Sequence, residues 1–105
     1  MAISEREKTA VRLFASGVNC AQAVLEAFSD VTGLEKSFAA KLASSFGGGM
    51  GRMREVCGAV SGMLMVAGLL YGYDDPGEND VNKKAHYRLV QTLAGQFREK
   101  IGSII

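Results

Sequence analysis

The chain has 105 residues, close to the modal size of a protein domain, so we expect a single domain over residues 1–105. Hydrophobic residues make up 48% of the chain and charged residues 22%, which excludes an intrinsically disordered protein. The net charge of +1 is too small to indicate a nucleic-acid partner. Thirteen glycines against one proline favour glycines within or between closely packed helices over long loops.

The N-terminal third predicts two helices, each introduced by a capping-box pattern. Ser4 is followed three positions later by Glu7, and Asn19 by Gln22. A glycine after each segment, at 17 and at 33, is placed to end the helix in a left-handed conformation. The apolar stripes are Ala10, Val11, Phe14 and Ala15 in the first helix, and Val24, Leu25, Phe28 and Val31 in the second.

A third helix is expected over residues 35–45, with Phe38, Ala39 and Leu42 facing inward. The glycine-rich stretch over residues 46–52 then interrupts the helical pattern. Three consecutive glycines cost too much backbone entropy in a helix, and they permit positive φ angles. We therefore expect a loop here.

A fourth helix is expected to begin between residues 53 and 56 and to end near Leu70. The 18 residues over 56–73 carry no charge, which is the length of a transmembrane candidate. Cys57, Ser61 and four glycines favour instead a central helix surrounded by its neighbours. The pairs Gly58/Gly62 and Gly68/Gly72 would let another helix approach closely.

A turn follows at residues 74–77, and Asn79 or Asp80 is expected to cap a last helix that ends at Ile101. Its inward set is Val81, Ala85, Leu89, Val90, Leu93, Phe97 and Ile101. No segment alternates as a strand would. The sequence thus predicts an all-α fold, a compact bundle of about five helices with a glycine-rich loop before a buried central helix.

Two cysteines are the first candidates for chemistry. Cys20 lies in the first turn of the second helix, where free amides and the helix dipole favour a thiolate. Cys57 lies early in the fourth helix among small residues, which leave room beside its sulfur. The alternative interpretation is that both are small apolar core residues. The charged N-terminus, which lacks an apolar run, predicts no signal peptide, and hence a cytoplasmic protein with reduced thiols.

The glycine-rich loop is the second candidate site. Gly47, Gly48, Gly49 and Arg52, with Arg54 nearby, resemble an anion cradle of exposed amides and guanidinium groups. They match neither dinucleotide-binding nor P-loop spacing. The alternative interpretation, a connector that passes close to another helix, is favoured by spacing alone.

Other ligand-type residues point less clearly to a site. His86, the only histidine, is expected on the surface of the last helix, and one histidine cannot build a histidine-type zinc site within a chain. Four methionines gather around the fourth helix, at 50, 53, 63 and 65. Thioethers can lie near a soft cofactor, but core filling is the expected role.

Three ordered segments resemble the C_GCAxxG_C_C family, small proteins described as redox-active. The segments are GVNCAQAV over 17–24, FGGGMG over 46–51 and VCGAVSG over 56–62. The resemblance runs from about Arg12 to the C-terminus. The helical domain is also similar to the one attached to the haem region of split-Soret cytochromes, which form dimers.

The resemblance implies a redox-active or metal-binding protein, with Cys20 and Cys57 as a reversible dithiol or as part of the ligand set of an iron–sulfur cluster or another metal. It also implies a homodimer and an electron-transfer protein as partner. The family's further cysteines would follow the last helix, beyond Ile105. Four cluster ligands would therefore need those cysteines or a second subunit.

Two other hypotheses stay open. The chain can instead be a non-catalytic helical dimerisation module whose cysteines are structural. It can also be an enzyme that holds an anionic substrate at Arg52 and Arg54 and uses the Cys20 thiolate as nucleophile. The sequence does not decide whether the protein is an enzyme.

Overall fold

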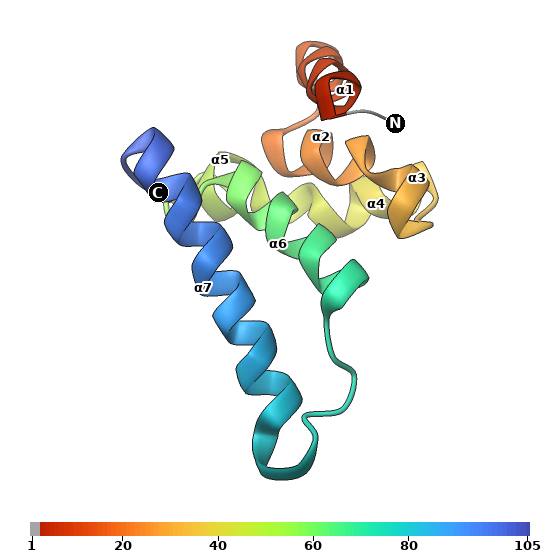
Figure 1. Cartoon of the computed structure of the whole chain (residues 1–105). Coiled ribbons are helices and arrows are strands. Elements are labelled where there is room, and N and C mark those ends of the chain that lie inside the picture. Colours follow the sequence, from red (N-terminus) through yellow and green to blue (C-terminus); the bar gives the residue numbers. More distant parts are fainter. Residues whose placement is uncertain (1–2) are drawn as a thin grey trace.

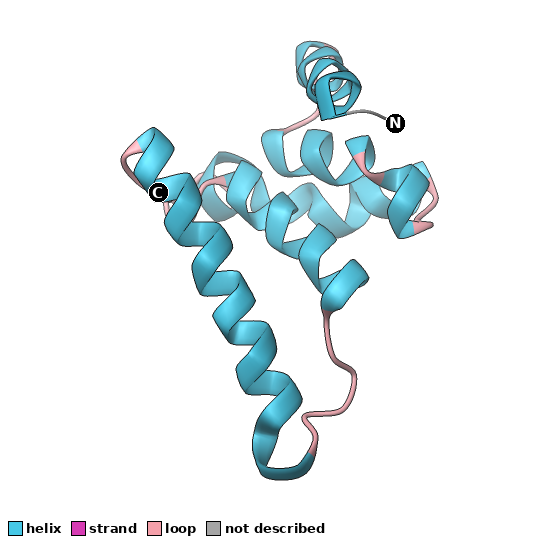
Figure 2. Cartoon of the chain, viewed as in Figure 1, coloured by secondary structure: helices cyan, strands magenta, loops and turns pink. Residues whose placement is uncertain are grey.

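The computed structural model describes residues 3–105, with side chains from residue 5 onward, and all regular structure in this part of the chain is helical (Figures 1 and 2). The helices are α1 (Ile3–Ala15), α2 (Cys20–Ala27), α3 (Ser29–Thr32), α4 (Lys36–Ala43), α5 (Gly47–Met50), α6 (Gly58–Tyr71) and α7 (Val81–Ile101), with 3-10 turns η1 (Ser44–Phe46) and η2 (Glu78–Asp80). The predicted all-α fold is confirmed.

The first half of the chain follows the predicted boundaries with two differences. Helix α1 already includes Ser4, so this residue is not its N-cap, and its side chain lies outside the described part. The second predicted helix is divided at Phe28, where φ is −105° and ψ is 12°. It resumes as the single turn α3, which ends at Gly33 with a left-handed φ of 75°, as its sequence predicts.

The core is built mainly from small side chains at the contact of α2 with α4 and α6. Its buried cluster consists of Ala21, Leu25, Ala39, Ala43 and Val66, with Phe28, Leu34, Phe46 and Met65 packed against it. Helix α4 therefore faces the core through Ala39 and Ala43. The prediction of Phe38 and Leu42 as inward residues is wrong by one position, about 100° of rotation, and both are exposed.

Other large side chains also point outward. Val11, Phe14 and Val31 were expected to be buried but are exposed. Alanines let helices approach more closely than bulky side chains do, and α2 and α4 meet along their alanine-rich faces.

Helix α6 crosses α2 at the two glycines of its first turns. A Cβ atom at Gly62 would lie 2.9 Å from Val24 Cβ and 3.0 Å from the carbonyl oxygen of Ala21. The predicted close approach at Gly58 and Gly62 is confirmed. The same prediction is wrong for Gly68 and Gly72. A Cβ at Gly68 would meet no atom within 4 Å, and Gly72 is the C-cap of α6.

Helices α6 and α7 form an open hairpin whose arms lie close together at the start of α6 and separate toward the loop that joins them (Figure 1). Of the predicted central helix, Gly58, residues 60–62, Val66 and Ala67 are buried, residues 59 and 63–65 are half-buried, and residues 68–71 are exposed. Its neighbours therefore enclose it only in part. No residue of α7 is buried. Of the set predicted to face inward, Leu89, Val90, Leu93 and Phe97 are half-buried, and Val81, Ala85 and Ile101 are exposed. The prediction fails at Val81 and Ala85 because α6 ends at Tyr71 and does not cover the first turns of α7.

None of the helices in the described range is long and apolar enough to span a membrane. The uncharged stretch over residues 56–73 contributes only 14 residues to α6.

Helix α1 is attached to the corner between α2 and α3 through Arg6. Its guanidinium donates to the carbonyl oxygen of Ala27 at 3.2 Å and makes a two-pronged contact with the Asp30 carboxylate, at 2.6 and 3.0 Å. It also lies 4.8 Å from the ring centre of Phe28. The hydrogen bond from Arg6 lowers the pKa of Asp30.

Candidate functional site

Cys20 is the first residue of α2, where the sequence predicts it, and Asn19 is its N-cap. The Gln22 amide donates to Asn19 Oδ1 at 2.9 Å, and the Asn19 amide donates to Gln22 Oε1 at 2.9 Å. Asn19 Nδ2 also donates to the carbonyl oxygen of Ser44 at 3.1 Å. The cap therefore fixes the start of α2 against the segment that leads into the glycine-rich loop.

Cys57 is the N-cap of α6, because this helix begins at Gly58 and not between residues 53 and 56. Its side chain makes no capping hydrogen bond. Its amide donates to the carbonyl oxygen of Ile104 at 2.6 Å. The segment after α7 thus returns to the start of α6 and brings Ile105 beside Cys57.

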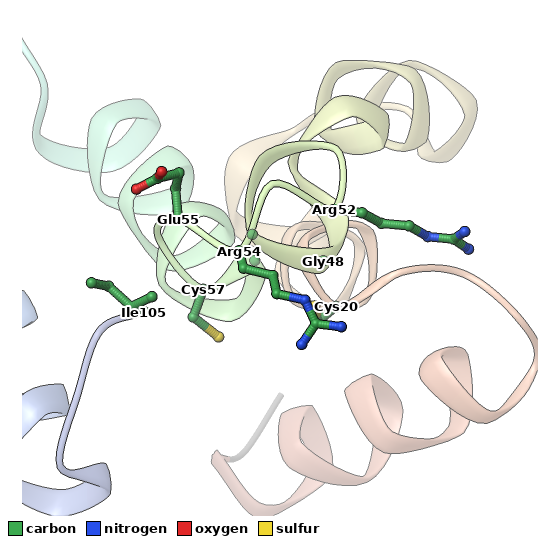
Figure 3. Close-up of a pocket in the computed structure, with 9 residues that line it drawn as sticks. Cys20, Gly48, Arg52, Arg54, Glu55, Cys57 and Ile105 are labelled. Carbon is green, nitrogen blue, oxygen red and sulfur yellow. The ribbon is translucent and has the colours of Figure 1, made fainter.

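Both cysteines line one open pocket of about 640 Å³. Arg52, Arg54 and Ile105 also line it (Figure 3). The Cys57 sulfur and the Arg54 guanidinium both extend into the open space between the surrounding segments (Figure 3). Both thiols are free and half-buried. Two cysteines 37 positions apart in the sequence are therefore placed at a common solvent-accessible site.

Gly58 sets how closely the cysteines approach. A Cβ atom at Gly58 would lie only 2.7 Å from Cys20 Sγ and 3.0 Å from the carbonyl oxygen of Phe46. Because consecutive Cα atoms are about 3.8 Å apart, the Cα atom of Cys57 lies within roughly 8 Å of the Cys20 sulfur. A larger residue at position 58 would separate α2 from α6 and fill the space beside that sulfur.

The wall opposite α6 is a left-handed turn. Five consecutive residues, 48–52, have φ between 64° and 72°, and Arg54 has a φ of 59°. Glycine adopts such angles freely, but other L-residues lose about 1–2 kcal/mol each. Met50, Arg52 and Arg54 are therefore strained. The sequence predicts positive φ for the glycines but gives no signal that these three neighbours share it.

The predicted anion cradle is only partly assembled. Gly48, Gly49 and Arg52 line the cysteine pocket, but Gly47 lies against Asn19 instead. The amides of residues 52, 54 and 55 donate to the carbonyl oxygens of residues 47, 48 and 49, at 3.1 to 3.3 Å. These three amides are thus used within the turn, and the guanidinium groups of Arg52 and Arg54 are candidate donors to an anion. Among the described side chains, no acidic group forms an ion pair with Arg52 or Arg54.

The remaining ligand-type residues lie elsewhere. His86 is half-buried on α7 and makes an edge contact with Tyr73, with ring centroids 6.0 Å apart, so it is not the solvated surface residue expected. Its Nδ1 atom is buried and has no hydrogen-bond partner. The hydrogen bond between the hydroxyl groups of Tyr73 and Tyr87 raises the pKa of Tyr73. Of the methionines, Met65 packs against the core and Met53 is exposed.

The residues of this pocket do not complete a metal site. No three histidine, cysteine, aspartate or glutamate side chains of the described part are grouped as metal ligands. An iron–sulfur cluster normally takes four protein ligands, and a structural zinc ion takes four as well. The pocket offers two thiols and the Glu55 carboxylate, with two guanidinium groups on the same wall, which is fewer than the four ligands that either centre takes.

Two residues of the pocket carry little signal in the sequence. Ile105 reaches it only because the chain reverses after Gly102, whose φ is 98°. Arg54 stands out as a charge near Arg52, but only the left-handed turn places it on the wall of the cysteine pocket.

The chain was compared with protein families, curated proteins and solved structures. One family model, described as "Putative redox-active protein (C_GCAxxG_C_C)", matches residues 18–105. No curated protein and no solved structure matches. The matched region begins at the turn before Cys20 and includes the glycine-rich loop, Cys57 and the returning C-terminal segment. The chain therefore belongs to the C_GCAxxG_C_C family, whose members are described as redox-active.

Proposed function

We propose that Cys20 and Cys57 form a redox-active dithiol. The observation that carries the proposal is their presence in one open pocket, each at the N-terminal end of a different helix. Family membership supports redox chemistry, and the lack of a ligand set in the described residues favours a dithiol over a metal centre.

In this reaction each thiol gives up a proton and one electron, and a bond forms between the two sulfur atoms. The electrons pass to an oxidised partner such as a disulfide. The pocket leaves both sulfur atoms half-buried, so a small oxidant can reach them. The cytoplasm, where thiols are kept reduced, is the compartment we propose for this chemistry.

The test is thiol titration before and after reduction, on protein purified without oxygen, together with metal analysis. We expect wild-type protein to lose both thiols on mild oxidation and to recover both with reductant. Mass spectrometry of the digested oxidised protein should show one peptide pair linked through Cys20 and Cys57. Cys20→Ser and Cys57→Ser are matched controls, because each leaves a single thiol that cannot form this bridge.

Two results would contradict the dithiol. One is stoichiometric iron or zinc that protects both thiols. The other is a pair of metal-free thiols that stay reduced under every oxidant tested.

A second proposal, a homodimer, is supported by the open hairpin. The exposed end of α6 (Leu69, Leu70 and Tyr71) and helix α7, which has no buried residue, present apolar side chains that nothing within the described chain covers. A second copy offers the same apolar surface, which is self-complementary about a two-fold axis. The net charge of +1 creates little repulsion between copies. This role alone would make the protein a dimerisation module with structural cysteines.

A further inference from the structure

We propose that the cysteine pocket accepts small disulfides that carry a carboxylate, and that Arg54 binds the carboxylate. This inference rests on the dithiol function proposed above and names its substrate class. It starts from three features of one wall of the pocket: the backbone strain, the unpaired charge and the direction of the Arg54 side chain.

Glycine would adopt the backbone conformation of Arg54 with less strain. Its φ of 59° lies in the left-handed region, and its amide donates to the carbonyl oxygen of Gly48 at 3.3 Å to close the turn. Glycine would keep this hydrogen bond without the steric conflict of a Cβ atom. Strain of this kind is a reason to look for a functional role of the side chain.

The charge of Arg54 is available to a ligand. No acidic side chain of the described residues pairs with it. Glu55 lines the same pocket but directs its carboxylate away from the Arg54 guanidinium (Figure 3). A guanidinium presents several N–H donors in a planar fork that matches the two oxygens of a carboxylate.

The position of Arg54 connects this charge to the thiols. Its guanidinium extends into the open space that the Cys57 sulfur also faces (Figure 3), and Cys20, Arg54 and Cys57 all line one pocket. Arg52 is less well placed, since its side chain points away from Cys57 and its Cγ packs over Gly48 (Figure 3). The pocket volume of about 640 Å³ is within the range of small-molecule sites.

The reaction is thiol–disulfide exchange. One pocket thiolate attacks a sulfur of the substrate RS–SR, whose S–S bond breaks, and RS⁻ leaves and takes a proton from water. The mixed disulfide is then attacked by the second pocket thiolate. The Cys20–Cys57 bond forms and the second RS⁻ leaves. Two electrons pass from the two protein thiols to the substrate disulfide.

The experiment compares 3,3′-dithiodipropionate, which is dianionic, with cystamine, which is dicationic, as oxidants of the reduced wild-type protein. The rate of each disulfide with the protein is divided by the rate at which the same disulfide reacts with dithiothreitol. This ratio removes the difference in intrinsic reactivity between the two disulfides. We expect the normalised rate to favour the anionic disulfide by about tenfold, the value of one charge-assisted hydrogen bond. The preference should decrease as salt is added.

The variant Arg54→Gly should abolish this preference while the protein remains folded. Asn79→Gly is the matched control, because Asn79 also has a left-handed φ, of 54°, but lies in η2, away from the cysteine pocket. Asn79→Gly should relieve comparable backbone strain and keep the preference for the anionic disulfide. Equal normalised rates for both disulfides in wild-type protein, or an unchanged preference in Arg54→Gly, would overturn the inference and leave the dithiol intact. Failure of both disulfides to oxidise the pair would instead contradict the proposed function itself.

Discussion

At the scale of single residues, Asn19 does the most to place the Cys20 thiol. Its side chain accepts a hydrogen bond from the Gln22 amide and donates one to the Ser44 carbonyl oxygen. The first bond starts α2 at Cys20, and the second ties this start to η1. A Cβ at Gly47 would lie 2.5 Å from Asn19 Cβ, so no larger residue fits beside the cap.

We predict that Asn19→Ala lowers the free energy of unfolding by about 1–2 kcal/mol, because the helix cap is lost together with the contact to Ser44. Asn19→Asp separates the two effects, since its carboxylate still caps the Gln22 amide but cannot donate to Ser44. It should retain more stability than Asn19→Ala. Urea unfolding followed by circular dichroism measures the stability of both variants. Equal stability of wild type and Asn19→Ala would show that the cap contributes nothing.

The sequence reveals this cap because its signal is local. Asn19 and Gln22 are three positions apart, and their pairing needs no information about the rest of the fold. The strain at Arg54 is different. It arises because Gly48 and Gly49 begin a left-handed turn whose backbone hydrogen bonds then impose the same hand on the arginines. The strain at Arg54 is therefore seen only in the structure and not in the sequence.

At the scale of elements, the contact between α2 and α6 determines the distance between the two cysteines. Gly58 and Gly62 are one helical turn apart on the face of α6 that meets α2. Added atoms would press on the backbone of Ala21 and Phe46, which cannot rotate away as a side chain can. Any larger residue at these positions would therefore strain the crossing.

We predict that Gly58→Ala and Gly62→Ala each lower the free energy of unfolding by about 1–3 kcal/mol, through overpacking. Gly68→Ala is the control on the same helix. A Cβ there meets no atom within 4 Å, and alanine is the better helix former by up to about 1 kcal/mol, so stability should rise. Thermal unfolding of the three variants tests the crossing, and a Gly62→Ala protein as stable as wild type would contradict it.

Spacing alone predicts both glycine pairs in this helix, but only the first is used in a helix crossing. The two glycine pairs differ in the surface that they face. Gly58 and Gly62 face the alanine-rich surface of α2, whereas Gly68 is exposed where α6 leaves the core. In the same way, the apolar periodicity over α4 predicts a helix but does not decide which face of that helix is buried. Apolar residues at 38, 39, 42 and 43 suit two faces, and close packing selects the alanines.

At the scale of the whole molecule, the described chain has two unequal parts. One is the compact core of α2, α4 and the first half of α6; the other is the open hairpin formed by the end of α6 and α7 (Figure 1). A hollow between the hairpin arms is lined by Tyr71, Tyr73 and Leu89, among others. A second hairpin packed here would complete a four-helix arrangement and cover these apolar groups.

For the proposed homodimer we expect a mass of twice 11.2 kDa in light scattering coupled to size-exclusion chromatography. Tyr71→Glu should shift the protein to monomer, since it places a charge in the apolar interface. Val11→Glu is the control, because Val11 has the same 69% exposure but lies on α1, away from the hairpin. A wild-type monomer at micromolar concentration, or equal dissociation by both variants, would refute this interface.

The return of the C-terminal segment affects how the protein should be purified. Ile104 is hydrogen-bonded to the Cys57 amide and Ile105 forms part of the pocket wall, so a peptide fused after Ile105 would emerge beside both thiols. A polyhistidine tag placed there would supply imidazoles to two cysteines, and two thiolates with two imidazoles make a tetrahedral zinc site. Such a fusion would create the metal centre that the residues of this pocket do not themselves form.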